Sequence, residues 1–315
     1  MPVALSLART SLASGPASQD PGVRETGGTP RPSAPRRRPR TRLRVFGIPF
    51  LKPRFLVGAI LLVLIVLAVA LGPFVVPFDP NAQDLTLRIL PPSLAHPLGT
   101  DHLGRDILAR VLAGGRISLA LAIVATIASA VIGIAAGLVA GYRGRRIETA
   151  IMGVVDAQLA FPFILLAIAL VATIGPSVPT VLLVMALSAW VGFTRPVHAA
   201  TLALKDRDFV TAAVGLGLPA FTIIRRHLAP HVLPIGIVVG TVQLAQLVLF
   251  ESALSFLGLG VPPSVPTWGA MLSESRTYIQ VAPWTSIFPG LAIVVCVFAI
   301  SIVGDWLRTL TNPRG

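Results

Sequence analysis

Acidic side chains inside long apolar stretches are the first candidates for chemistry in this sequence. Asp156 and Glu251 each lie in an apolar stretch of roughly 20 residues. A charged carboxylate in hydrocarbon costs about 2.5 to 3.5 kcal/mol on insertion scales, so each should face a polar interior or a partner. They could line a polar path and meet an amino group, a metal cation or a transferred proton. Alternatively, Asp156 pairs with a loop arginine such as Arg146, and Glu251 caps or pairs at the end of its stretch.

A second group of polar residues precedes another apolar stretch. His96, Asp101 and His102 carry side chains of the kinds that ligate metal ions. Their spacing is not one of the compact patterns that are typical of a metal site. We therefore predict no metal ion here.

The segment from Asp208 to Pro234, DFVTAAVGLGLPAFTIIRRHLAPHVLP, combines small residues with two arginines and two histidines. Asp208 can cap a helix of about two turns over residues 209–216, which Gly217 and Pro219 would end. The sequence predicts a second short helix over residues 222–228, ended by Pro230. Both helices are expected to lie nearly parallel to a membrane surface.

The first of these helices would present an almost bare face, because Ala212, Ala213 and Gly215 carry little or no side chain. Such a face can seat in a groove of another protein. A helix that merely lies on lipid would instead carry a wide apolar face with Trp, Phe or Leu. We therefore predict that this face docks a protein, and that His227 and His231 bond backbone carbonyls rather than a metal.

The elements that position these residues are predicted to be membrane-spanning helices. Of the 315 residues, 54% are hydrophobic and only 12% are charged, and the mean hydropathy is +0.81. These values exclude an ordinary soluble domain, and the chain lacks the short alternating segments of a membrane barrel. The sequence therefore predicts an all-α polytopic protein. Its six expected spans are residues 55–76, 117–140, 151–174, 179–197, 232–254 and 284–304.

The positive charges follow the expected topology. The net charge is +13, and residues 1–45 form a Pro-, Ser-, Gly- and Arg-rich segment that we predict to be a disordered basic tail. Arginines recur between the second and third spans, between the fourth and fifth spans and at the end of the chain, which predicts that both termini are cytoplasmic. The tail is expected to contact anionic lipid rather than nucleic acid. The outer loops would be residues 77–112, a short GPSVP turn and residues 257–283.

Two further features concern energy supply and packing. The only lysines, Lys52 and Lys205, do not follow a phosphate-binding GxxxxG run, so we expect no ATP hydrolysis by this chain.

The single cysteine, Cys296, is expected to pack as a small hydrophobe. Glycines at every fourth position predict close helix contacts, either within the chain or with a second membrane subunit; they are Gly133, Gly137 and Gly141, and Gly236 and Gly240.

The segment from Asp208 to Pro234 resembles the EAA loop of the membrane subunits of bacterial ABC importers. Thr211, Ala212 and Ala213 precede Gly217 at the interval of that loop, and residues 227–230, HLAP, stand at its ending. Thr211 replaces the glutamate of the family pattern and Ala229 replaces its leucine. The departures concern polar contacts of the loop and leave its geometry intact.

Three more stretches resemble one group of these permeases, the dipeptide/oligopeptide/nickel family, and within it the DppC or OppC type. They are HPLGTDHLGRDILARVLAGGRISL at 96–119, ESALSFLGLGVPPSVPTWGAML at 251–272 and, more loosely, GDWLRTLTNPRG at the end. The resemblance covers the chain from about residue 55. It divides the chain into the tail at 1–45, the first span and its approach at 46–76, an extracytoplasmic loop at 77–112, and a permease core at 113–315 with its EAA loop at 208–234.

The resemblance implies a type I ABC importer permease with six spans and a cytoplasmic coupling helix, in the bacterial cytoplasmic membrane. The implied partners are a second, DppB/OppB-like permease, two ATPases that hold ATP and Mg²⁺, and an extracytoplasmic substrate-binding protein. No cofactor or metal is expected on this chain. The residues expected to couple to the ATPases are Asp208, Phe209, Thr211, Ala212, Ala213, Gly217, Arg225, Arg226, His227 and Pro230.

The implied activity is ATP-driven import of dipeptides and oligopeptides, with nickel complexes as the alternative substrate. On physical grounds, a proton-coupled secondary transporter would also use Asp156 and Glu251, and a membrane scaffold without transport is a third possibility. Residues expected to shape the outer entrance and contact the binding protein are His96, Gly99, Asp101, Gly104, Arg105 and Asp106.

Overall fold

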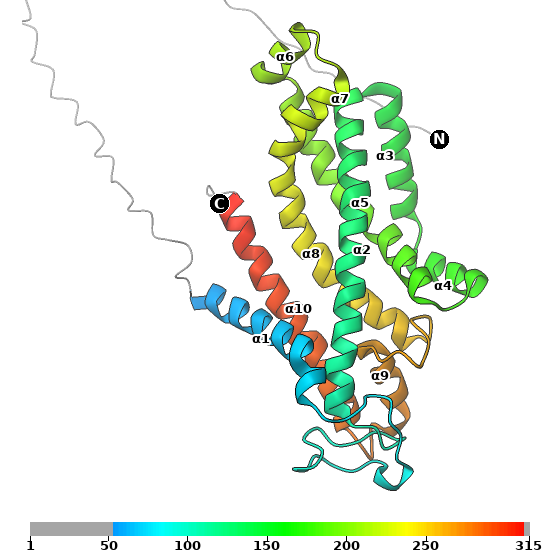
Figure 1. The fold of residues 1–315 in the computed structure, drawn as a ribbon. Coiled ribbons are helices and arrows are strands. Elements are labelled where there is room, and N and C mark those ends of the chain that lie inside the picture. The colour runs from blue at the N-terminus through cyan, green and yellow to red at the C-terminus, as the bar shows by residue number, and fades with distance from the viewer. Residues whose placement is uncertain (1–52, 312–315) are drawn as a thin grey trace, which may run out of the picture. The chain divides into compact units, whose positions relative to one another are not determined.

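A computed structural model describes residues 53–311, and this part of the chain is built from helices joined by short connections and by a long loop at 77–106 (Figure 1). It contains no β-strand, only an isolated antiparallel bridge between Thr100 and Asp106. The predicted all-α class is confirmed, while the basic tail at 1–45 lies outside the described residues. The α-helices are α1 (Pro53–Val75), α2 (Ile107–Arg143), α3 (Arg145–Ala160), α4 (Phe163–Ile174), α5 (Val178–Lys205), α6 (Asp208–Gly215), α7 (Ala220–Ile223), α8 (Ala229–Phe256), α9 (Trp268–Ser275) and α10 (Trp284–Thr311). Short helices η2 (Leu85–Leu87), η3 (Ile224–Leu228) and η4 (Arg276–Tyr278) complete the described elements.

The described helices can account for the six expected spans, and several of them are longer than expected. Among the described residues, α1, α2, α5, the run from α7 through α8, and α10 are each long and apolar enough to cross a membrane. The pair α3 and α4 makes a sixth span if it is counted as one. α2 begins ten residues before the expected span because Asp106 caps it, accepting a hydrogen bond from the Ala109 N–H at 2.8 Å.

The expectation of one continuous helix over residues 151–174 is wrong. α3 and α4 meet at 89°, with the break at Phe161 and Pro162. Proline lacks an N–H and disfavours helical backbone at the residue before it. Phe161 accordingly has extended backbone, with φ −104° and ψ 135°.

The glycine repeats are packing faces within the chain. α2 lies along α5 (Figure 1), and a Cβ added at Gly133 would collide with the Trp190 carbonyl oxygen. A Cβ at Gly137 would stand 2.7 Å from the Thr194 carbonyl oxygen, and one at Gly236 of α8 would stand 2.8 Å from a methyl carbon of Ile134. Of the two alternatives, contact within the chain is therefore confirmed for these glycines.

Three buried clusters hold the described helices together, and the smallest packs α4 against α5 and α8. The largest cluster joins α2, α5, α8, α9 and α10 around Trp268, and it includes Cys296, which is fully buried as expected. The second lies where α6 meets α5, α8 and the end of α2, and its members include Leu138, Val197, Val210 and Leu228. This second cluster positions the segment that the sequence assigns to coupling.

Candidate functional site

α6 forms close to the predicted position but is capped differently. Arg207 is the residue that precedes the helix, and its side chain makes no capping bond, so the expectation that Asp208 caps the helix is wrong. Asp208 instead stands in the first turn, where its negative charge is favourable beside the free N–H groups. The predicted stop is confirmed, because Gly217 has φ +72° and the Leu218 N–H returns to the Ala213 carbonyl.

The exposed face of α6 is less bare than the sequence predicts. Val210 and Ala213 are buried against Leu228 and Val232, so Ala213 is not available to a partner. Ala212 and Gly215 remain exposed. The free surface also carries larger apolar side chains, Phe209, Val214, Leu216 and Phe221.

The predicted second short helix, ended by Pro230, is wrong. α7, the π-helical turn η3 and α8 form one run from Ala220 to Phe256. Pro230 lacks an N–H, and the Ala229 N–H before it bonds to the Ile224 carbonyl five residues back. The proline is accommodated in the first turn of α8, where its missing N–H leaves no strain.

An aromatic contact ties α6 to the start of α8. The rings of Phe209 and His231 stack with their centres 5.1 Å apart. His231 Nδ1 lies 2.8 Å from the His227 carbonyl oxygen, which confirms the expected backbone bond for His231. His227 Nδ1 is buried and has no hydrogen-bond partner among the described residues, so the same expectation fails for His227. Arg225 and Arg226 are exposed beside this contact.

At the opposite end of the helices (Figure 1), four charged residues form what we term the ion-pair network: Asp101, Arg105, Arg110 and Glu274. Arg110 Nη1 lies 2.6 Å from Asp101 Oδ2 and 2.7 Å from Glu274 Oε2, and Arg105 bonds to the same two carboxylates. Arg110 is only 2% exposed. The network joins the 77–106 loop and α2 to α9.

The arginines also set the ionisation of the two carboxyl groups. Burial opposes the charge on Asp101, but Arg105 and Arg110 outweigh it and hold the pKa of Asp101 below its usual value. The pKa of Glu274 is lowered by the same two arginines against the same opposing effect of burial. Both groups are therefore anionic at neutral pH.

The remaining residues expected at the outer entrance are parts of the loop framework. His96 Nδ1 lies 2.8 Å from Asp106 Oδ2, and both side chains are buried. Gly99 and Gly104 have φ of +78° and +74°, and a Cβ at either would meet a backbone carbonyl oxygen. These residues hold the loop in shape, and their contact with a binding protein stays a prediction.

The possible metal ligands in the structure are not the set that the sequence offered. Ligand atoms of Asp101, His102 and Glu274 lie within 4.8 Å of one another, while His96 belongs to a different pair. Burial is the main cause of the lowered pKa of His102. Arg105 and Arg110 already pair with both carboxylates, so a metal ion would have to displace these ion pairs to be ligated.

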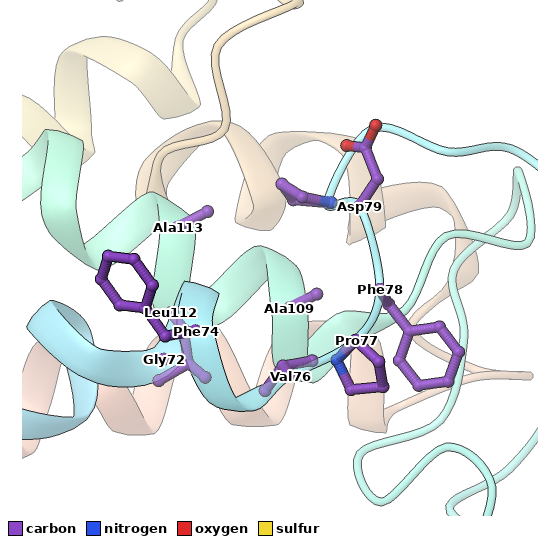
Figure 2. A pocket seen from close by; sticks show the side chains of 10 residues that line it. Gly72, Phe74, Val76, Pro77, Phe78, Asp79, Ala109, Leu112 and Ala113 are labelled. Carbon is purple, nitrogen blue, oxygen red and sulfur yellow. The ribbon is translucent and has the colours of Figure 1, made fainter.

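A pocket of about 420 Å³ opens beside this loop, where the end of α1 passes the start of α2 (Figure 2). Small residues of α2, Ala109 and Ala113, leave the space, and Phe74 and Phe78 stand on either side of it in Figure 2. The ring of Phe78 also lies 5.0 Å from that of His96. The pocket therefore adjoins the loop framework rather than the ion-pair network.

The two acidic residues of the apolar stretches have opposite environments. Glu251 of α8 is fully buried and accepts hydrogen bonds from Ser118 at 2.9 Å and from Ser255 at 2.7 Å. Asp156 of α3 is exposed and pairs with Arg195 of α5 at 2.6 Å. The expected pairing with Arg146 is wrong, because the partner is an arginine of a spanning helix. Glu251 joins α8 to α2, and a role of either residue in a path stays a prediction.

Comparison with known proteins places the chain in one family. A family profile described as "Binding-protein-dependent transport system inner membrane component" matches residues 133–314, and one described as "N-terminal TM domain of oligopeptide transport permease C" matches residues 50–92. The dipeptide transport system permease protein DppC of Alkalihalophilus pseudofirmus is 37% identical over 82% of this chain and 85% of its own length. The chain belongs to this permease family.

Other relatives agree with this assignment. The glutathione transport system permease protein GsiD of Pectobacterium atrosepticum is 39% identical to the permease over 87% of the chain and 92% of its own length. A chain of the methionine ABC transporter MetNI, solved in inward-facing conformations, covers 64% of the permease and 96% of its own length, with a TM-score of 0.53 and 19% identity. The protein is thus a multi-pass permease subunit of an ABC importer.

Sequence reasoning missed the partners of the permease's charged residues. Glu274 lies 169 residues from Arg105, and no local pattern signals that they meet. Arg195 gave a usable signal, since it lies inside the expected span 179–197 and there needs a partner. The contact between Phe209 and His231 gave none, because it depends on the path of the chain through α7 and η3.

Proposed function

We propose that the permease imports dipeptides and short oligopeptides, paired with a second DppB/OppB-like permease and driven by two separate ATPases. ATP and Mg²⁺ would bind to these ATPases, and an extracytoplasmic binding protein would deliver the substrate. The names of the relatives support peptides over nickel complexes, since they describe dipeptide and glutathione permeases. The family also argues against the proton-coupled alternative.

One observation carries the coupling role. α6 is fixed to the spanning helices by Val210, Ala213 and the stack of Phe209 on His231, while Ala212, Val214 and Gly215 remain exposed on it. An element that is rigidly attached on one face and free on the other can pass a push from a partner into α5 and α8. Closure of the ATPases on ATP would supply that push and exchange inward-open and outward-open states.

The topology follows from the same role. α6 would face the cytoplasm together with both termini, and the 77–106 loop with its ion-pair network would face outward. This orientation agrees with the arginine-rich connections at the α6 end, which include Arg143, Arg145 and Arg146.

The test is a bulky charge on the free face of α6. We expect Ala212→Arg to lower ATP-dependent uptake of L-Ala-L-Ala at least tenfold, with unchanged membrane levels, because the side chain blocks the seat of the ATPase. The matched control is Ala150→Arg, which puts the same charge on an exposed alanine of α3 outside the coupling segment. Uptake into proteoliposomes by the purified complex is the measurement.

Two results would contradict the proposal. Uptake by Ala212→Arg at the wild-type rate would remove the coupling role and favour a scaffold. Uptake that needs a proton gradient and continues without the ATPases would favour a secondary transporter.

A further inference from the structure

The ion pair between Asp156 and Arg195 joins two helices, α3 and α5, that belong to the spanning part of the permease. Asp156 stands 11 residues after the first residue of α3, or about 16 Å along the helix. The hydrocarbon core of a bilayer is about 30 Å thick, so Asp156 lies within it when α3 begins near one surface. Arg195 of α5 is at the same depth, because its Nη2 is 2.6 Å from Asp156 Oδ1.

Both members of the pair are open to the surroundings of the chain. The side chain of Asp156 is 64% exposed and that of Arg195 is 51% exposed. Charged side chains inside a bilayer face a protein interior or a water-filled cavity, since exposure to lipid is costly. This face of α3 and α5 therefore borders water or protein rather than lipid.

The helix break beside the pair leads to the same conclusion independently. α3 ends four residues after Asp156, and the break at Phe161 and Pro162 is exposed. Non-helical backbone at membrane depth is tolerated only in protein or along a water-filled cavity. Broken helices of this kind surround the substrate sites of many transporters.

The space around the carboxylate is suited to a ligand. Gly153 and Ala160 lie one turn before and one turn after Asp156 on the same face of α3, and both are exposed. A Cβ added at Gly153 would meet no atom within 4 Å. Met152 and Leu159 also lie one turn from Asp156 on this side of α3, and the side chain of Asp156 stays 64% exposed beside them.

The pair also has unused bonding capacity. Among the described residues, Asp156 accepts a bond only at Oδ1, and Arg195 donates only from Nη2. Oδ2 and the other guanidinium N–H groups remain for a ligand. A guanidinium binds a carboxylate through parallel hydrogen bonds, and a carboxylate binds an ammonium group by a charge-assisted bond.

The pair is not needed to attach α3 to α5. His198 Nε2 lies 2.8 Å from Glu148 Oε1, and the Trp190 indole N–H donates to Gln158 Oε1 at 2.7 Å. Both contacts join the same two helices and are less exposed than the ion pair. These contacts attach α3 to α5 without the ion pair.

We propose that Asp156 and Arg195 form a binding site, within the spanning part of the permease, for the two charged ends of a zwitterionic peptide. Arg195 binds the terminal carboxylate, and Asp156 binds the terminal ammonium group. The proposal rests on the proposed function, since it names the contacts that a peptide makes while it passes the permease. It predicts that the permease itself, and not only its binding protein, selects peptides with free ends.

The test compares L-Ala-L-Ala with its C-terminal amide, which lacks the carboxylate. Uptake of both is measured with the complete purified transporter and the same binding protein, so that the selectivity of the binding protein is common to all variants. We expect Arg195→Gln to lower uptake of L-Ala-L-Ala about tenfold and to leave uptake of the amide within twofold. The preference for the free carboxylate should fall by the same factor.

Two further variants separate binding from structure. Glu148→Gln removes the neighbouring tether and should leave the ratio of the two uptake rates unchanged. Asp156→Asn should reduce uptake of L-Ala-L-Ala more than uptake of N-acetyl-L-Ala-L-Ala, which lacks the ammonium group. The ATPase activity that the loaded binding protein stimulates reports whether each variant complex is assembled.

The outcomes are distinct. If Arg195→Gln reduces uptake of the free and amidated peptides equally, or reduces neither, the proposed site is wrong. If Arg195→Gln fails to assemble, the ratio is read from Arg195→Lys, which keeps the charge and should lower the preference only partly; an unchanged preference would overturn the site. If the wild-type transporter takes up no peptide at all, the proposed function itself fails.

Discussion

Glu274 balances two arginines, Arg105 and Arg110, that would otherwise leave positive charge in the interior. Arg110 is 2% exposed and Arg105 is also buried, so loss of Glu274 leaves two buried arginines with Asp101 as their remaining carboxylate in the network. We expect Glu274→Gln to lower the free energy of unfolding by about 3 kcal/mol. Thermal unfolding of the detergent-purified permease is the measurement, and Glu148→Gln is the control, because its histidine partner lies at a more exposed site. A shift no larger than that of the control would show that the network contributes little.

The same network predicts a pH dependence. The pKa values of Asp101 and Glu274 are lowered in the folded protein by Arg105 and Arg110, against the opposing effect of burial. Their stabilisation is therefore complete above the unfolded-state values of about 4, and it is lost as the pH falls through the lowered values. The unfolding temperature of the wild type should fall in this acidic range. Glu274→Gln should show a smaller decrease.

The helix pair α2 and α5 depends on glycine where the backbones touch. Because a Cβ at Gly133 would collide with the Trp190 carbonyl oxygen, we expect Gly133→Ala to destabilise the permease by about 1 to 3 kcal/mol. Gly153→Ala is the matched control, since a Cβ there meets nothing within 4 Å and alanine favours the helix. Thermal unfolding of both variants checks this. Equal stability of the two would mean that α2 and α5 do not need this close approach.

The elements also show which features a single sequence can predict. Apolar length predicted the spanning helices, and glycine spacing predicted their contact faces, because both depend on local composition. Proline was harder to interpret. Pro162 lies within an expected span but breaks it. Pro230 was expected to end a helix but is tolerated in the first turn of α8. The pairing of Arg195 with Asp156 or of Glu274 with Arg105 requires the fold itself.

The whole molecule has two chemically different ends, and labelling can show which end faces the cytoplasm. Leu94 of the 77–106 loop and Leu216 after α6 are highly exposed, whereas the native Cys296 is fully buried and should not react. We expect an impermeant maleimide to label Leu94→Cys in intact cells and Leu216→Cys only after the membrane is opened. The reverse pattern would invert the orientation and remove α6 from the reach of cytoplasmic ATPases.

α5 lies between two unlike neighbours. On its α2 side, Gly133 and Gly137 bring backbone against backbone, which leaves no room for sliding. On its α3 side, where Val155 is the one buried residue that α3 contributes among the described residues, hydrogen-bonded side chains bridge the two helices. Side-chain bonds can break and form again with new partners, whereas interlocked backbones cannot. When α6 moves α5, we therefore expect α2 to travel with it and the shear to fall along α3, so that Arg195 would change partners once in each transport cycle.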